Sequence, residues 1–313
     1  TKQSSSCFVA FWIASLAMTR CDDIGMMQAQ PASDDMMTVS RYCCLTPVLA
    51  ALAAPAIVIG VPASPAQAQT QPQIEGTPRR MVLNLTFAPA KASDQLKSGK
   101  GRMTIELSGS RCTEYKMIRH TVADLQFAGG AIKLMSDATV TENGDGTQLA
   151  FAITDRVNGE VKRQDSLVAR KTPQGIVATS QKLPGGRVVL PADVLLPLHH
   201  DRLSDAAVRE RKPLVAAVYN PEDSLSSIDR ITYRTGDEVK SPLPKGHPAA
   251  AMADAPRYRV EILRNDKNGK FRVRENMTRY LNGVFTVSDT VFENMRIKAE
   301  LASVKLLPQK PCP

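Results

Sequence analysis

Apolar residues recur at every second position along much of the chain beyond residue 80. The first such run is Met81–Phe87, and later runs occupy residues 103–107, 149–153, 258–262 and 295–301. A strand with one buried and one solvated face has this two-residue period, and antiparallel sheets are built from such strands. The pattern therefore predicts an all-β domain.

Turn sequences separate these runs. Asn158-Gly159 and Asn268-Gly269 each stand between two candidate strands, and Asn-Gly readily adopts the two positive φ angles of a type I′ hairpin turn. Residues 143–146 and 184–186 are further turn candidates. Short connections between about a dozen candidate strands favour one large curled antiparallel sheet, a β-spiral or open barrel, because curling limits exposed edges.

Two segments depart from the alternating pattern. His199–Lys212 has a helical composition and is followed by Pro213, which ends a helix. We expect this short helix to plug one mouth of the curled sheet. Residues 241–256 are rich in Pro and Ala and are expected to form a surface loop.

The segment before the alternating region has the three parts of a secretory signal peptide. Arg41 precedes an apolar run at residues 45–61, and Ala66-Gln67-Ala68 follows it. We predict a signal peptide at residues 36–68, with cleavage after Ala68 and export to the periplasm. The run is close to the length of a membrane span, so a retained anchor is the alternative, although prolines within the run disfavour it.

The predicted cut divides the chain into four parts. Residues 1–35 are expected to be an upstream extension absent from the working protein, and residues 36–68 the signal peptide. Residues 69–80 are polar and predict a linker, and residues 81–313 predict a single β-spiral domain.

Cysteine positions agree with export. Four of the six cysteines lie before the predicted cut, and Cys112 and Cys312 remain. In an oxidising compartment two remaining cysteines most simply form one disulfide, with two free thiols as the alternative. A bond between them would tie the early strands to the C-terminus.

The sequence has no recognisable catalytic motif, and we expect neither a cofactor nor a metal. HExxH, GxSxG, P-loop and dinucleotide-glycine patterns are missing. His199-His200-Asp201 is the only fragment that resembles an acid/base or metal group, and helix capping and surface solvation by Asp201 are its simpler interpretation. An envelope-acting hydrolase that uses these three residues is the alternative function.

Charge and aromatic residues do not indicate nucleic-acid binding. The formal net charge is +9, but the basic residues are interspersed with acidic ones and form no long block. Dispersed aromatics at alternating positions are more typical of a core than of a base-stacking surface. If the sheet is hollow, the same aromatics would line an apolar cavity. These aromatics include Tyr115, Tyr219, Tyr233, Tyr258 and Tyr280.

Three segments stand out for their order along the chain. They are Gly101–Tyr115, the stretch 190–223 with its Val-Tyr-Asn-Pro-Glu-Asp sequence, and residues 280–312. Together they resemble the cell-envelope integrity EipB family. The resemblance implies a periplasmic spiral sheet similar to lipoprotein carriers, a disulfide at the positions of Cys112 and Cys312, and a role in envelope homeostasis without enzymatic activity. It also implies a periplasmic tetratricopeptide-repeat protein as partner. The alternating strands without catalytic motifs separately lead us to expect that the curved sheet binds a lipid, a lipoprotein or a protein partner, with membrane contact only through the cleaved signal peptide.

Overall fold

The computed structural model describes residues 77–92, 95–309 and 312. The upstream extension, the signal peptide with its cut after Ala68, and most of the predicted linker lie outside these residues. The described part begins just before the first strand, which starts at Arg79, two residues inside the predicted linker. No helix among the described residues is both long and apolar enough to cross a membrane.

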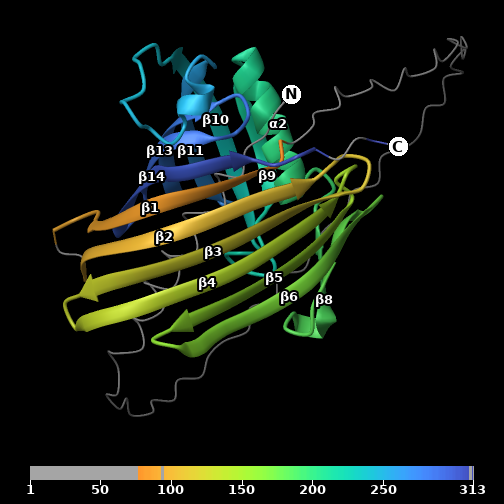
Figure 1. Ribbon diagram of the computed structural model, residues 1–313. Helices are drawn as coiled ribbons and strands as arrows, with labels where there is room; N and C mark the ends of the chain where they lie inside the picture. Colours follow the sequence, from red (N-terminus) through yellow and green to blue (C-terminus); the bar gives the residue numbers. More distant parts are fainter. Residues whose placement is uncertain (1–76, 93–94, 310–311, 313) are drawn as a thin grey trace, which may run out of the picture. The chain divides into compact units, whose positions relative to one another are not determined.

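Fourteen strands form one antiparallel sheet, which confirms the predicted all-β class and curled sheet (Figure 1). The strands, in chain order, are β1 (Arg79–Pro89), β2 (Leu96–Gly109), β3 (Glu114–Phe127), β4 (Gly130–Asn143), β5 (Gln148–Val157), β6 (Glu160–Thr172), β7 (Gly175–Thr179), β8 (Arg187–Leu190), β9 (Leu214–Tyr219), β10 (Ile228–Glu238), β11 (Arg257–Asp266), β12 (Phe271–Tyr280), β13 (Phe285–Val291) and β14 (Met295–Leu306).

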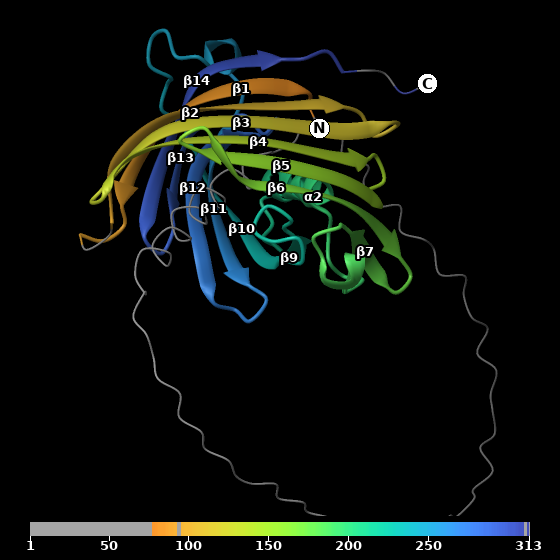
Figure 2. The same cartoon turned by 90° about the horizontal axis from the view of Figure 1, so that it is seen from below.

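The first and last strands pair in the middle of the sheet. The N-terminal arm runs outward from β1 to β8, and the C-terminal arm runs outward from β14 to β9. Every neighbour except β1–β14 is also a neighbour in the chain, so each arm is a simple meander. The arms bend toward the same side (Figure 2), and the sheet therefore has an inner and an outer face.

The alternating apolar residues point toward the inner face, as predicted. Leu85 lies opposite Ala299 and Phe87 lies opposite Ile297, and all four side chains are buried. Buried side chains from both arms belong to one hydrophobic core. Complete burial of a Leu or Phe side chain contributes about 1.5–3 kcal/mol, so this alternation is the main stabilising feature of the sheet.

The two Asn-Gly hairpins form, but with different turns. Asn158 and Gly159 have φ angles of 52° and 86°, as a type I′ turn requires. In the second hairpin only Gly269 has a positive φ, and the Asp266 carboxylate accepts the backbone N–H groups of Asn268 and Lys270. The type I′ prediction for this turn is wrong, because the Asp266 carboxylate holds a longer loop.

The predicted helix forms two residues earlier in the chain than expected, as α2 (Pro197–Glu210). Pro197 occupies the first turn, where its fixed φ suits a helix and its missing N–H is not needed. Arg211 ends the helix in the left-handed conformation, with φ of 55°. Two short 3-10 turns complete the fold, η2 (Pro184–Gly186) and η3 (Ala250–Met252).

The Pro/Ala-rich loop between β10 and β11 is mostly exposed, as expected for a surface loop. Ala249 and Met252 are exceptions, because both side chains are buried. The loop is therefore attached to the core at η3.

Helix α2 contacts the inner faces of both arms. Arg202 pairs with Glu142 of β4 in the N-terminal arm, and Asp205 pairs with Arg279 of β12 in the C-terminal arm. The helix also follows β8 and precedes β9, the two terminal strands of the sheet. It therefore bridges the arms at the point where the sheet is not closed by strand pairing.

Candidate functional site

His199, His200 and Asp201 lie in three separate environments at the start of α2. His199 is partly buried, and Nη2 of Arg202 lies 3.1 Å from its Nδ1. Burial and the Arg202 charge lower the pKa of His199 to about 4. His200 is buried, packs against the ring of Tyr233 at 5.5 Å, and has its pKa lowered to about 3 by burial. Both imidazoles are therefore neutral at pH 7.

Asp201 is 1% exposed, so the predicted surface solvation is wrong. The capping prediction is also wrong, because Leu196 holds the cap position and no side chain of this segment caps the helix. Neither Asp201 oxygen accepts a hydrogen bond from a described residue. Burial raises the pKa of Asp201 well above its usual value, although charges on Arg279, Arg79 and Arg264 oppose the shift.

The N-terminus of α2 is capped from the sheet instead. Glu142 of β4 accepts the Leu198 N–H at 2.9 Å, and its other oxygen lies 3.3 Å from Arg202. A carboxylate at this position is favoured by the helix dipole. Burial nevertheless raises the pKa of Glu142 to about 8. The Arg202 guanidinium lies 4.8 Å from the centre of the Tyr115 ring, so strand β3 also helps to hold the helix.

The β4–β5 turn fits between α2 and the disulfide. Gly146 has φ of 72°, and an added Cβ would lie 2.6 Å from the His199 ring. Gly144 packs even more closely, because an added Cβ would lie 1.7 Å from the Arg111 carbonyl oxygen. Next to Arg111, Cys112 is joined to Cys312 by a disulfide, with the two Cα atoms 5.5 Å apart. The helix start, two hairpin turns and the C-terminal tail are thus held together.

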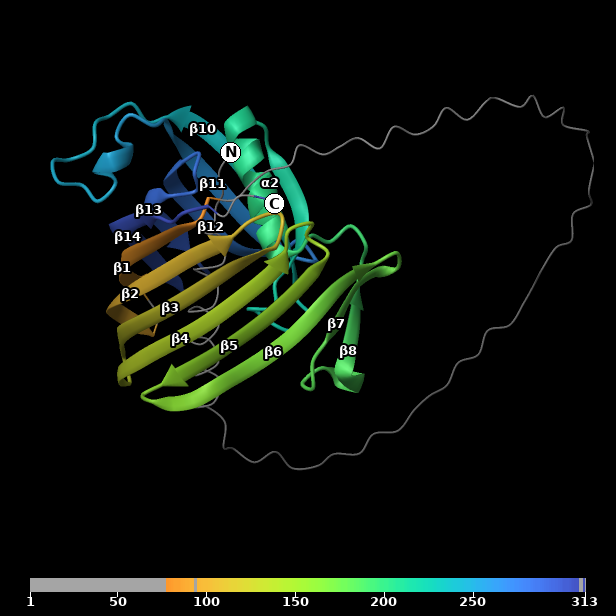
Figure 3. The same ribbon diagram turned by 45° about the vertical axis from the view of Figure 1, so that its right-hand side comes forward.

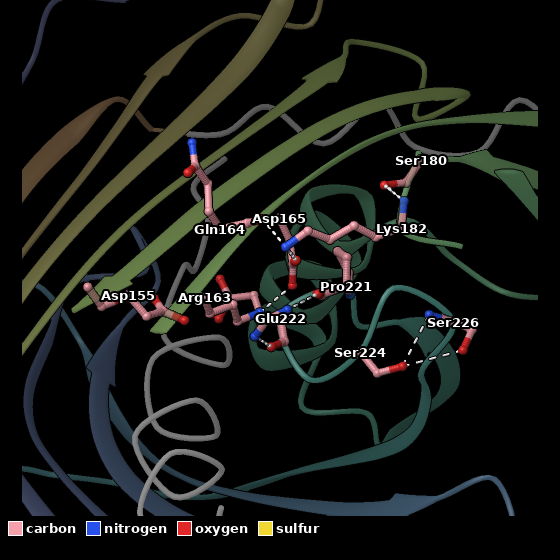
Figure 4. Close-up of polar contacts among 11 residues, drawn as sticks. Asp155, Arg163, Gln164, Asp165, Ser180, Lys182, Pro221, Glu222, Ser224 and Ser226 are labelled. Carbon is pink, nitrogen blue, oxygen red and sulfur yellow. Dashed lines mark hydrogen bonds and ion pairs between the residues drawn. The ribbon is translucent and has the colours of Figure 1, made fainter. Parts of the chain in front are cut away.

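A second charged group surrounds the loop between β9 and β10, residues 220–227. Glu222 accepts a hydrogen bond from Arg119 of β3 at 2.7 Å, and both side chains are 1% exposed. Arg163 of β6 donates to the carbonyl oxygens of Pro221, at 3.2 Å, and Glu222 (Figure 4). The N-terminal arm therefore holds this loop with arginines from two strands.

The C-terminal arm holds the same loop from the other side. Arg272 of β12 pairs with Asp223, and Asn220 donates to Asp229 of β10 at 2.7 Å. We refer to Arg119, Arg163, Arg272, Glu222 and Asp223 as the Glu222 clamp. The residues are far apart in the chain, and they connect arms that no strand pairing joins on this side.

These contacts are suited to holding a structure rather than to a reaction. The side chains of His200 and Asp201 are buried, with exposed fractions of 0% and 1%. Residues 77–92, 95–309 and 312 contain no group of three His, Cys, Asp or Glu side chains that could hold a metal ion. The arrangement supports closure of the sheet by buried charge.

The clamp was not predicted from the sequence, although a sequence signal exists for Arg119 and for other buried charges of the sheet. Arg119 stands two residues after Met117 on the buried face of β3, and Arg79 stands two residues before Met81 in β1. Glu275 and Arg279 continue the buried alternation of β12 in the same way. A charged residue at an inward position of a strand needs a buried partner. Its place in the alternation is therefore enough to identify it as a candidate for a buried ion pair.

The EipB-like family model matches residues 70–308, which is well over half of the chain. This chain belongs to the EipB-like family. The matched range includes the Glu222 clamp and α2. The Val218–Asp223 segment leads from the end of β9 into the loop that joins the arms.

A solved structure supports the EipB-like fold. The chain is similar to the crystal structure of a beta-barrel-like protein of domain of unknown function DUF1849 from Brucella abortus. The TM-score is 0.70 at 16% sequence identity, over 75% of this chain and 100% of that one. A comparison with curated proteins finds no match. The EipB-like family is thus a barrel-like domain family and is not a known enzyme family.

Proposed function

We propose that this EipB-like chain is a non-enzymatic periplasmic protein that supports cell-envelope integrity by binding a protein or lipoprotein partner. Family membership supports the envelope role, and the predicted signal peptide at residues 36–68 supports export. Oxidising conditions would also suit the Cys112–Cys312 disulfide.

The observation that carries the binding part is the composition of the inner face. Apolar side chains of both arms form one core, and α2 and the Glu222 clamp add buried charge to the same side. A lipid tail would have to displace these contacts. The proposal therefore assigns partner binding to the outer surface and the edges of the sheet.

An envelope-stress assay tests the role. Deletion of the gene should sensitise the bacterium to detergent and to cell-wall antibiotics, and the full chain should restore resistance. A chain without residues 36–68 is the matched control, because it keeps the domain but loses the export signal. Unchanged resistance after deletion, or full rescue by the control chain, would contradict the proposal.

A fractionation experiment tests the location. The protein should be recovered with periplasmic markers, and its N-terminus should be Gln69. A recovered protein that begins before Gln69, or that remains in the cytoplasm, would contradict export by the predicted signal.

A further inference from the structure

Several stretches of strand edge in the described part of the chain have no neighbouring strand. Three of them are the β9 edge, the first half of β6 and the β8 edge, and the first two of these are covered. On β9, Leu195 donates to the Ala217 carbonyl at 2.8 Å and accepts the Tyr219 N–H at 2.9 Å. The covering backbone forms a short parallel bridge. Edges are commonly protected in this way against unwanted pairing.

The second edge is the first half of β6. Strand β7 pairs only with Val168–Thr172, so residues 160–167 have no strand neighbour on that side. Lys182 reaches across this edge, donates to the Gln164 carbonyl, and pairs with Asp165 at 2.9 Å (Figure 4). A lysine on an edge strand is a known protective device.

The third edge is β8, the terminal strand of the N-terminal arm (Figure 3). Ser180 donates to the Gly186 carbonyl at 3.1 Å, which makes this a hydrogen-bonded pair. Because bonded and non-bonded pairs alternate in an antiparallel ladder, the backbone groups of Arg187 and Val189 point away from β7. No hydrogen bond from a described residue to these groups is found.

The outer face beside this edge is apolar and positively charged. Val189 and Val168 are 47% and 46% exposed. Val189 lies in one cross-strand row with Val177 and Arg170, and Val168 lies in the next row with Thr179 and Arg187. Arg170 and Arg187 are exposed, and neither forms an ion pair with a described residue.

We propose that the β8 edge binds an extended acidic segment of a partner protein, which adds a strand to the sheet. The outward N–H and C=O groups of Arg187 and Val189 would form the backbone hydrogen bonds, as in other cases of strand addition. An acidic side chain would lie opposite Arg187, and an apolar one opposite Val189. This inference rests on the proposed function, because it specifies the partner and the surface that binds it.

Charge favours this occupant over a second copy of the chain. Pairing of two β8 edges would bring the unpaired Arg170 and Arg187 of both copies to one surface, where like charges repel. An acidic strand would instead neutralise them. Pro191 follows β8 and has no N–H to donate, so the binding edge is short and suits a segment of a few residues.

Fluorescence anisotropy with a labelled heptapeptide tests the edge. The probe Thr-Glu-Thr-Val-Thr-Glu-Thr places an acidic residue on either side of an apolar one, so it fits in both strand directions. The purified chain should bind it, and a peptide with Lys in place of both Glu should bind at least about tenfold more weakly. N-methylation at the Glu, Val and intervening Thr amides should abolish binding, because it removes the backbone donors for either strand direction.

The variant R187E should reverse the preference toward the Lys peptide. The matched control R102E makes the same charge change at an exposed arginine of β2 and should bind like the original chain. Absence of saturable binding, or equal binding by R187E and R102E, would overturn the proposal. A dimer that forms without peptide and is lost in R187E would also overturn it.

These measurements use purified protein, so they are independent of the envelope-stress assay. Loss of stress resistance after gene deletion, together with no peptide binding, would contradict the proposal that the β8 edge binds an acidic segment. The proposed function would be unaffected. Peptide binding together with unchanged resistance would contradict the proposed function alone.

Discussion

Two groups of buried charges join the same pair of arms, but they are satisfied differently. In the Glu222 clamp, each acidic side chain faces an arginine within hydrogen-bonding distance. At the start of α2, Asp201 is equally buried, yet neither of its oxygens accepts a hydrogen bond from a described residue. We infer from the comparison that burial alone does not make a charged group stabilising. Whether the group raises or lowers the free energy of unfolding depends on its direct hydrogen bonds.

The largest expected effect is removal of the acidic partner in the clamp. Glu222→Ala leaves the Arg119 guanidinium buried without its carboxylate, which should lower the free energy of unfolding by about 3–5 kcal/mol. Urea denaturation followed by circular dichroism measures this loss. Glu160→Ala removes an exposed pair with Lys162 and serves as the control, with a much smaller expected loss because solvent screens this pair.

If Glu222→Ala lowered the free energy of unfolding no more than the control does, the clamp would stabilise the fold no more than an exposed ion pair.

The second effect concerns pH. Burial raises the pKa of Glu275 from its ordinary value of 4.5 to about 7. Its contribution is fully present below pH 4.5 and is lost as the pH rises through 7, because the folded state then contains a buried charge. Compared with Glu275→Gln, the original chain should therefore lose about 3 kcal/mol over this range.

Chemical denaturation of both proteins at a series of pH values measures the difference. Parallel stability curves for Glu275→Gln and the original chain would show that Glu275 does not titrate in this way.

The third effect tests the cap of α2. Glu142→Ala removes the acceptor of the Leu198 N–H and one partner of Arg202. It should therefore lower the free energy of unfolding by about 2 kcal/mol. A cap at this position stabilises the helix rather than the sheet. Hydrogen exchange should therefore increase first at the amides of residues 198–202, and uniform exchange over all strands would contradict a local role.

The smallest effect is expected at Asp201. Asp201→Asn removes an ionisable group that accepts no hydrogen bond from the described part of the chain, so stability at pH 7 should change by less than about 1 kcal/mol. A gain is as compatible with this prediction as a small loss. A loss comparable with that of Glu222→Ala would show that Asp201 takes part in an essential ion pair.

The strands could be predicted from the sequence because the alternation of apolar and polar residues within a short segment specifies which side of a strand is buried. The alternation in Met81–Phe87 specifies which residues point inward, and that pattern holds in the structure. It does not specify the neighbour of a strand, and the central pairing of β1 with β14 was accordingly not predicted. The pairing brings together residues separated by most of the domain.

The candidate site was harder to predict for the same reason. His199-His200-Asp201 resembled an acid/base or metal group because the residues are adjacent in the sequence, but the three side chains lie in different surroundings. Arg119 and Glu222 are 103 positions apart and form the buried pair. The buried alternation of β3 marks Arg119 as unusual, whereas Glu222 lies in a loop without such a pattern, and only the folded chain shows that the two residues meet.

A double-mutant cycle between Arg119 and Glu222 tests most directly whether buried charge joins the arms. Arg119→Met, Glu222→Gln and the double variant would be compared with the original chain by urea denaturation. We expect a coupling free energy of about 2–3 kcal/mol, at the upper end of values for residues in contact. A coupling free energy near zero would contradict the account, because the two arms would then not be held together by this pair.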